Sequence, residues 1–397
     1  MTDERAAAHT PAEYMTSFDP ACPQQAYHDL AMASPFTAPD GMPLVTRMVE
    51  LVALNRHPAV HATDGVHFNL GGKRPLIPLD LDGPEHTRFR RLLDPLFAPK
   101  SVARLSDQVR SLTNALIDDF ADRGDVELFE AFCVPLPSQI FVRLLGLPLS
   151  DLPRFVAFKD ATVRPEGATD EERETFKARA GETMYTYLQH VLEQRRHEPP
   201  RDDLIGGFLT TEVNGDRLSD EDIIDICYLL VIAGLDTVTS SLSCLVAWLA
   251  QHTEQRDQLV QDPSRIPAAI EELMRFESPV HLGHRWVAED IEIAGRHLEG
   301  GTKVMVVWAS ANLDPDAVAD PLTIDLERTD CRHVSFASGF HRCLGSNLAR
   351  LELRIALEEL HRRIPDYRIT PGAVPVYINY GVRAAIQLPL SFTPSPC

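Results

Sequence analysis

The sequence predicts a mainly helical fold with a small β part, on three observations. The run from Ile226 to Ala250, about 25 residues long, is almost entirely apolar, and a helix of that composition must pass through a large core. Apolar residues from Leu344 onward recur at spacings of four, three and four, which places them on one helix face. Between residues 284 and 308 apolar and polar residues alternate, and glycines supply turns, as in a small antiparallel sheet.

The elements of the first half follow from local patterns. Residues 1–60 mix short helical stretches with turns. Asp82-Gly83-Pro84-Glu85 has the proline and the acidic residue typical of a helix start, and it precedes a basic helix through Leu92. Two helical patterns interrupted by prolines occupy residues 102–150. A polar, charged segment is expected at 165–183, followed by an amphipathic helix that ends at Arg196.

The second half is ordered around the long helix. Asn214-Gly215 predicts a hairpin turn between short strands. The apolar helix is expected over residues 221–250, with another from Pro267 to Phe276. Short strands are expected from about Val374 to Phe392. Because there is no internal repeat and no linker rich in glycine or serine, we expect residues 1–397 to form one domain.

Composition and charge exclude several classes of protein. With 24% charged and 44% apolar residues the chain is globular, and its net charge of −20 argues against duplex nucleic acid as a partner. The seven cysteines are dispersed without a Cys-x-x-Cys pair, so we expect no disulfide framework or cysteine zinc site, and a reducing cytoplasm as the setting. The opening MTDERAAAHT does not look like a signal peptide. Asp236 within the apolar run and the acidic flank before it favour a core helix over a membrane anchor.

A single cysteine in a loop between two glycines is the strongest functional feature. Gly339 and Gly345 lie four residues before and two residues after Cys343, where they let the backbone turn sharply and approach a flat ligand. Cys343 precedes a helix, whose free N–H groups and dipole favour a thiolate, a good axial ligand for haem iron. His341 and Arg342 add donors or positive charge. The alternatives are a buried structural cysteine, or a nucleophile for which no His or Asn constellation is evident.

This loop resembles the haem-binding signature of the cytochrome P450 superfamily, Phe-x-x-Gly-x-His/Arg-x-Cys-x-Gly. The matching residues are Phe336, Gly339, His341, Cys343 and Gly345. Ala337 stands where the family often has glycine, and we expect little consequence from this small residue. The resemblance runs from about residue 76 to the C-terminus. It implies the cytochrome P450 fold, with a long central helix over haem b and the cysteine-ligand loop preceding a helix.

Three other segments match motifs of the same family. Glu272-Leu273-Met274-Arg275 resembles its Glu-x-x-Arg helix motif, about 70 residues before the cysteine, although such a pair alone is usually a solvated ion pair. Asp325-Leu326-Glu327-Arg328 resembles the later Phe-Asp-x-x-Arg segment, with Ile324 in place of Phe, and Asn312-Leu313-Asp314-Pro315 resembles the Asn-x-Asp-Pro turn. The resemblance implies that a structural ion-pair network supports the cysteine loop, formed by Glu272, Arg275 and Arg328.

An acid and an alcohol interrupt the apolar helix in Ala233-Gly234-Leu235-Asp236-Thr237. A glycine inside a helix costs about 1 kcal/mol relative to alanine, and a buried aspartate is costly unless paired. A local opening of the helix beside a ligand would explain both; the alternative is a helix rich in Ser and Thr that packs closely, with Asp236 in a salt bridge. The segment resembles the family's oxygen-activating motif, Ala-Gly-x-Asp/Glu-Thr. This implies that Thr237 hydrogen-bonds dioxygen while Asp236 relays protons, and that the enzyme uses dioxygen plus two electrons.

The anchors for the haem propionates come from the same resemblance. His86 and Arg90 stand at i and i+4 of a helix that would otherwise be a basic surface helix. Residues 83–91 resemble the family's Pro-Pro-Glu-His-x-x-x-Arg-Arg helix, which implies that both side chains bind the anionic propionates. Arg285, after the Glu-x-x-Arg helix, and His333, upstream of the cysteine loop, are assigned likewise. The cofactor-binding set is therefore His86, Arg90, Arg285, His333, Gly339, His341 and Cys343.

A substrate pocket is expected beside the long helix. Its predicted lining is Leu229, Ile232, Ala233, Val280, His281 and Leu282. The resemblance implies a lid from the regions around residues 62–76 and 155–185. Such an apolar pocket suits a terpenoid, steroid, fatty acyl or aromatic molecule. His281 is a candidate polar contact, and a histidine that merely faces solvent is the alternative.

Two basic segments interrupt the acidic chain. Residues 86–100 carry four cations against one aspartate, and residues 341–363 carry five arginines against three glutamates. We expect a basic patch that docks an acidic ferredoxin, which receives electrons from ferredoxin reductase; merely uneven surface charge is the alternative. Charge reversal at Arg91 or Arg350 is then expected to slow reduction by ferredoxin. We expect a cytoplasmic monomer.

Together these features predict a soluble, bacterial-type haem-thiolate monooxygenase. Cys343 is its expected metal ligand, and Asp236 and Thr237 its expected catalytic residues. Two alternatives from other classes stay open. A non-catalytic haem-binding sensor would keep the same ligand but has no need of the acid–alcohol pair. A helical interaction protein without cofactor would make every motif structural.

Overall fold

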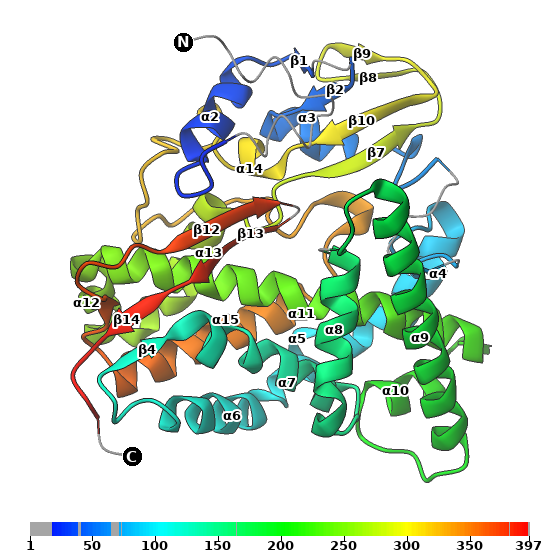
Figure 1. Cartoon of the computed structure of the whole chain (residues 1–397). Coiled ribbons are helices and arrows are strands. Elements are labelled where there is room, and N and C mark those ends of the chain that lie inside the picture. The colour runs from blue at the N-terminus through cyan, green and yellow to red at the C-terminus, as the bar shows by residue number, and fades with distance from the viewer. Residues whose placement is uncertain are drawn as a thin grey trace. The chain divides into compact units, whose positions relative to one another are not determined.

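The computed structural model of the chain describes residues 18–38, 41–64, 71–72, 74–163, 165–380 and 382–395 (Figure 1). It separates into two compact units. Unit 1 comprises residues 1–61, 106–134 and 237–397, and unit 2 comprises residues 62–105 and 135–236. The single domain over residues 1–397 stays a prediction. Because helices dominate and the sheets are small, the described structure agrees with the predicted fold class.

Unit 1 contains the helices that flank the cysteine loop. The helices are α2 (Gln24–Met32), α3 (Met48–Leu54), α6 (Ser106–Asp118), the π-helix η3 (Phe129–Cys133), α12 (Thr253–Gln261), η5 (Pro263–Arg265), α13 (Ile266–Glu277), α14 (Trp308–Ala311), η6 (Gly339–His341) and α15 (Ser346–Arg363). Figure 1 shows α15 lying along α6, against which it packs. Leu348, Leu351 and Ile355 of α15 are buried, so the predicted apolar face is confirmed.

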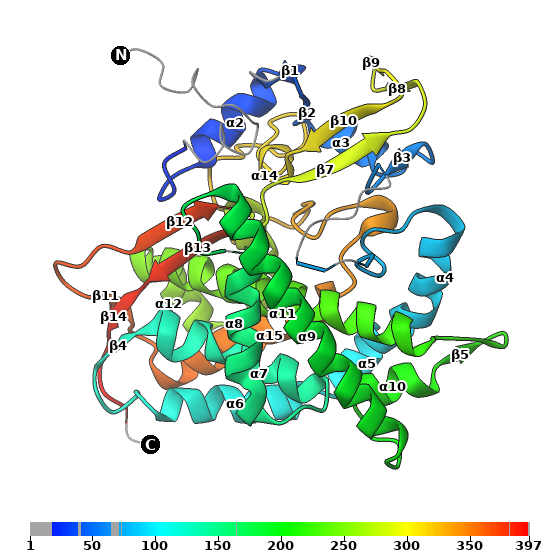
Figure 2. The same ribbon diagram turned by 45° about the vertical axis from the view of Figure 1, so that its right-hand side comes forward.

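The strands of unit 1 form a five-stranded sheet and three smaller sheets. The first has the order β1 (Phe36–Thr37), β2 (Pro43–Val45), β10 (Thr302–Val306), β7 (Gly283–Val287) and β3 (Val60–His61). The others are β11 (Arg368–Ile369), β14 (Pro389–Ser391) and β4 (Asp125–Glu127); β12 (Val376–Tyr380) with β13 (Val382–Gln387); and β8 (Ile291–Ile293) with β9 (Arg296–Leu298). β7 and β10 pair antiparallel, which sets Arg285 opposite Val304, and Figure 2 shows the two strands side by side.

The described residues of unit 2 form helices and one hairpin. Its elements are α4 (Gly83–Leu93), η2 (Asp94–Phe97), α5 (Pro99–Ala103), α7 (Pro135–Leu144), η4 (Leu149–Asp151), α8 (Leu152–Val163), α9 (Asp170–Arg196), α10 (Leu204–Thr210), β5 (Glu212–Val213) and β6 (Asp216–Arg217). Asn214 and Gly215 have φ of 55° and 83°, which confirms the predicted turn between β5 and β6.

The start of α9 differs from the prediction. The helix begins at Asp170, within the segment expected to be only polar and charged. Thr169 caps it, because its hydroxyl accepts a hydrogen bond from the Glu172 N–H while the Glu172 carboxylate accepts from the Thr169 N–H. This capping box supplies a helix start that the apolar pattern does not mark.

The long apolar helix α11 (Asp220–Gln251) runs from unit 2 into unit 1. By length and composition it could cross a membrane, but 72% of its most apolar window is buried inside the described structure, as in a core helix. The helix is continuous across residues 233–237, so the expected local opening is not present. Gly234 has a packing reason instead, because a Cβ there would lie 2.7 Å from Cδ2 of Phe141 on α7.

Candidate active site

The cysteine loop of unit 1 ends directly at the start of α15. The backbone N–H of Cys343 donates to the carbonyl of Phe336 at 2.9 Å, which closes the loop between these two residues. Gly345 is the N-cap of α15, and the Ser346 N–H points back to the Cys343 carbonyl at 3.5 Å. Cys343 is exposed and is not part of a disulfide. The thiol therefore stands at a helix N-terminus with its access open, as a metal ligand requires.

Two residues of this loop have left-handed backbone. Gly339 has φ of 69°, and a Cβ there would lie 1.9 Å from the Asn55 carbonyl oxygen, so only glycine fits. Ala337 has φ of 55°, a conformation that costs a residue with a side chain about 1–2 kcal/mol. The family's frequent glycine at this position thus has a physical reason, and the alanine carries a cost that we did not expect from its small size.

Asn55, at the C-terminal end of α3, joins the loop to Arg285 and was missed by the sequence reasoning. Its side-chain oxygen accepts from Arg285 Nε at 3.1 Å, and its Nδ2 donates to the Ser338 hydroxyl at 3.0 Å. Its carbonyl accepts from the Phe340 N–H at 3.4 Å. These partners lie more than 200 positions away in sequence, so no local pattern identifies the residue.

The three residues of the predicted ion-pair network lie together in unit 1. Arg275, fully buried on α13, donates twice to the Glu272 carboxylate at 2.8 Å, and Arg328 Nε donates to it at 3.1 Å. Arg275 also donates to the carbonyls of residues 312, 321 and 323. Burial acts to raise the pKa of the Glu272 carboxyl, but these cations and hydrogen bonds lower it overall, so the carboxylate stays charged. The network ties the segment before the cysteine loop to α13.

Arg285 and His333, two predicted propionate anchors, differ in their surroundings. Arg285 is buried in β7, and its guanidinium lies 5.9 Å from the ring centroid of Trp308. His333 has a buried side chain whose Nε2 lies 3.0 Å from Glu271 Oε2, and its Nδ1 accepts from the Ser335 N–H at 3.2 Å. Both ring nitrogens of His333 thus have protein partners. His341, on η6, is half-buried.

The other two predicted anchors belong to α4 of unit 2. His86 is buried, and Arg90, one turn further along the same face, is half-buried. Arg90 Nε donates to Asp94 Oδ1 at 2.7 Å. Pro84 in the first turn and Glu85 beside it begin this helix as the sequence predicts.

Asp236, the acidic residue within α11, forms a salt bridge, as one of the two interpretations of the sequence predicts. Asp236 is 4% exposed, and its Oδ1 lies 3.5 Å from Nζ of Lys159 on α8, which also contacts the partly exposed Asp160 at 2.7 Å. The next residue, Thr237, is half-buried. Ala233, four positions before Thr237, is exposed in a helix whose neighbouring residues are mostly buried. One face of α11 is therefore open beside the acid–alcohol pair.

The predicted substrate contacts vary in accessibility. Leu229 and Ile232 are buried, Ala233 is exposed, and Val280 and Leu282 are half-buried. His281 is 1% exposed and its ring lies 6.0 Å from that of Tyr27, so the solvent-facing alternative is wrong. Burial lowers the pKa of the His281 imidazole to about 4, which keeps it neutral.

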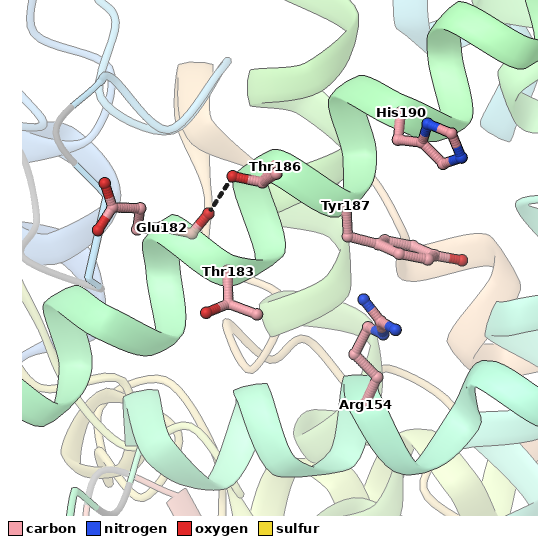
Figure 3. A pocket seen from close by; sticks show the side chains of 6 residues that line it. All are labelled: Arg154, Glu182, Thr183, Thr186, Tyr187 and His190. Atoms are coloured by element: carbon pink, nitrogen blue, oxygen red, sulfur yellow. Dashed lines mark hydrogen bonds between the residues drawn. The ribbon is translucent and has the colours of Figure 1, made fainter.

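A groove of about 520 Å³ lies between α8 and α9 in unit 2 (Figure 3). Its lining is Arg154, Glu182, Thr183, Thr186, Tyr187 and His190. Figure 3 shows Arg154 reaching from α8 toward Tyr187 of α9, and the guanidinium lies 4.6 Å from that ring's centroid. No predicted substrate contact lines this groove, which includes part of the expected lid. Residues 65–70, 73 and 164, which fall in the same lid regions, lie outside the described residues.

Ion pairs occupy most of the arginines in the two basic segments. In residues 86–100, Arg88 pairs with Asp216 and Arg90 pairs with Asp94. In α15 the pairs are Arg350 with Glu271, Arg354 with Glu358, Arg362 with Glu359, and Arg363 with Asp118. Because Arg350 forms its ion pair within unit 1, a substitution there would also disturb that pair, and Arg350 is therefore a poor probe of partner docking.

The donor set fits haem chemically. A thiolate at an accessible helix start suits haem iron, and the N–H donors of arginine and histidine suit the two haem propionates.

Comparison with known proteins finds relatives that cover most of this chain. A family model described as Cytochrome P450 matches residues 169–363. The steroid C26-monooxygenase of Mycolicibacterium smegmatis is 32% identical over 383 residues, 94% of this chain and 93% of that protein. The structure of Bacillus subtilis cytochrome P450 PksS, of the bacillaene polyketide synthase, has a TM-score of 0.84 at 28% identity and covers 95% of this chain and 100% of its own. P450BioI in complex with an acyl carrier protein carrying hexadec-9Z-enoic acid has a TM-score of 0.86 at 26% identity, over 94% of this chain and 98% of that chain.

Proposed function

This chain belongs to the cytochrome P450 family, and we propose that it inserts one oxygen atom of dioxygen into a hydrophobic small molecule. As a member it has the cytochrome P450 fold and is a haem-thiolate monooxygenase with haem b as its cofactor. The observation that carries the proposal is the accessible Cys343 between its loop and α15, together with the acid–alcohol pair on α11.

The protein's own groups have distinct tasks in this proposal. Haem b, when bound, supplies the activation of dioxygen. Cys343 would hold the iron through its thiolate, and Arg285, Arg90 and His86 would bind the propionates. The Thr237 hydroxyl donates a hydrogen bond to dioxygen and holds a water beside it, while the Asp236 carboxylate passes protons inward from solvent. Lys159 Nζ, 3.5 Å from Asp236 Oδ1, holds that carboxylate in place.

Thr237→Ala tests the alcohol's task. Without the hydroxyl, protons reach dioxygen in the wrong place, so we expect electrons to be consumed with less product and more hydrogen peroxide. The matched control is Thr186→Ala, because Thr186 is also a helical threonine, and its hydroxyl donates to the Glu182 carbonyl within α9 (Figure 3). Equal product per electron in the two variants would contradict the role of Thr237.

The substrate proposed is a terpenoid, steroid, fatty acyl or aromatic molecule. Ala233 of α11 is exposed, and Val280 and Leu282 are half-buried, so each of these apolar residues is accessible to a ligand. The names of the relatives support a steroid or an acyl chain first. A low-spin to high-spin shift of the haem spectrum on titration with a steroid or a long-chain fatty acid would support this, and no shift with any of the four classes would count against it.

Electrons are proposed to come from an acidic ferredoxin and its reductase in the cytoplasm. The basic residues proposed for this contact are Arg91 and Lys100 of the first basic segment and Arg342 beside Cys343. Arg91→Glu and Arg342→Glu should slow reduction by ferredoxin and leave reduction by dithionite unchanged. Arg332→Glu is the control, since Arg332 is 85% exposed and pairs locally with Asp330. Slowing of equal size in all three variants would argue against a specific patch.

A further inference from the structure

Two adjacent carboxylates of α13 enter separate networks. Glu272 binds Arg275 and Arg328, as the family motif implies. Glu271, one position earlier, turns instead to Arg350 on α15 and to His333 before the cysteine loop. No motif in the sequence pointed to Glu271, and Arg350 and His333 had been assigned to a docking patch and to the haem propionates.

Glu271 is bound by three donor atoms. Arg350 Nε donates to its Oε1 and Arg350 Nη2 donates to its Oε2, both at 2.7 Å, which is the bidentate geometry of a strong charged pair. His333 Nε2 lies 3.0 Å from Oε2. Burial acts to raise the pKa of the Glu271 carboxyl, but these donors overcome it and lower that pKa to about 2. The carboxylate is therefore charged across the range in which the protein works.

Arg350 contacts one residue before and one residue after Cys343, the expected metal ligand, in the sequence. Its guanidinium lies 4.3 Å from the ring centroid of Phe336, whose carbonyl accepts the Cys343 N–H. Its Nη1 also lies 3.4 Å from the Ser346 carbonyl, in the first turn of α15 after Cys343. The residues before and after the loop are thus held by one side chain, and Glu271 fixes that side chain.

Both ring nitrogens of His333 have hydrogen-bond partners in the same cluster. Because Nδ1 accepts from the Ser335 N–H, the neutral ring carries its proton on Nε2 and donates it to Glu271. The His333 side chain is 3% exposed. A propionate could recruit this ring only by displacing Glu271 or the Ser335 N–H.

We propose that Glu271, Arg350 and His333 form a clamp that positions the Cys343 loop, and that His333 acts there and not as a propionate anchor. These are positioning residues, since they act on the ligand through Phe336 and Ser346. The inference rests on the proposed haem-thiolate function and extends it to residues outside the family's motifs quoted above.

The test compares Glu271→Gln, His333→Gln and the double variant with Glu358→Gln. Glu358 is a matched control, because it is also a half-buried helical glutamate that pairs with two side chains, Arg110 and Arg354, but it lies further along α15. The readouts are the decay of the thiolate-specific Soret band of the reduced carbon monoxide complex and amide hydrogen exchange of the peptide over residues 334–345. Both are measured on the haem-loaded protein.

We expect the Glu271→Gln variant to lose the band roughly tenfold faster than wild type, because an amide cannot neutralise Arg350 and presents it with N–H groups. The loop peptide should exchange faster in the same variant. His333→Gln should act in the same direction, and the double variant should be no worse than the more affected single variant, as for residues in one network. Glu358→Gln should behave as wild type.

The inference is overturned if Glu271→Gln matches Glu358→Gln in both readouts. It is also overturned if the effects of Glu271→Gln and His333→Gln on the band add in the double variant, because additive effects indicate that His333 acts independently of Glu271, as a propionate anchor would. A wild-type protein that never forms the band would refute the proposed function itself, so the two failures are distinguishable.

Discussion

Replacing Gly339 by alanine tests whether the cysteine loop is held as the structure describes. An added Cβ would lie 1.9 Å from the Asn55 carbonyl oxygen, whereas real Cβ contacts are essentially never shorter than 3.0 Å. The loop or the end of α3 must therefore move by at least the difference, 1.1 Å. The left-handed φ costs alanine about 1–2 kcal/mol, and forced overpacking costs about 1–3 kcal/mol. We expect Gly339→Ala to lower the free energy of unfolding by about 2–5 kcal/mol.

The control separates backbone strain from the clash. Gly372 has φ of 83°, and a Cβ there meets nothing within 4 Å among the described residues, so Gly372→Ala should cost only about 1–2 kcal/mol. Urea unfolding measures both costs, and the carbon monoxide spectrum reports the thiolate. We expect only Gly339→Ala to weaken the thiolate-specific band. Equal destabilisation of the two variants, with an unchanged band in Gly339→Ala, would refute the reasoning.

Four further outcomes follow from the same contacts. Ala337→Gly should raise the free energy of unfolding by about 0.5–1 kcal/mol, because relief of the left-handed φ exceeds the added entropy of the unfolded chain; a loss of stability in urea unfolding would contradict this. Arg275→Lys should cost about 2–4 kcal/mol in the same measurement, because a lysine cannot replace the five hydrogen bonds of the buried guanidinium, and a cost as small as that of the exposed control Arg332→Lys would show otherwise. Asp236→Asn should lower kcat about 100-fold or more and raise the solvent deuterium isotope effect, with the carbon monoxide spectrum intact; an unchanged isotope effect would remove Asp236 from the relay. Since the pKa of Glu271 is lowered from 4.5 to about 2, its stabilising contribution is present above 4.5 and is lost as the pH falls toward 2, so the difference in stability between wild type and Glu271→Gln should shrink over that range; a constant difference would argue against it.

The features that the sequence predicts well are those set by local pattern. The alternation of residues 284–308 gives the strands β7 to β10, and the spacing of leucines after Cys343 gives the buried face of α15. Asn214-Gly215 gives its turn for the same reason, because two left-handed residues in succession suit few other pairs. Asp236 and the acidic flank favour a core helix for α11, and 72% of its most apolar window is buried.

The features that the sequence does not predict depend on contacts between distant segments. Asn55 contacts Arg285 and Ser338, 230 and 283 positions away, and no spacing rule connects them. Gly234 looked like a break in the helix, but only the position of Phe141 on α7 explains it. Arg350 looked like a surface charge, and its role depends on a carboxylate 79 positions earlier. Charge counts along the chain do not show which arginines are already paired.

The most direct test of the account is the reduced, carbon monoxide-bound spectrum of the haem-loaded protein. Ligation by the Cys343 thiolate predicts the red-shifted Soret band for which the family is named. Cys343→Ala should abolish this band, whereas Cys22→Ala, at another exposed cysteine, should keep it. A wild-type protein without the band, or a Cys343→Ala variant that retains it, would contradict the assignment of Cys343 as the iron ligand.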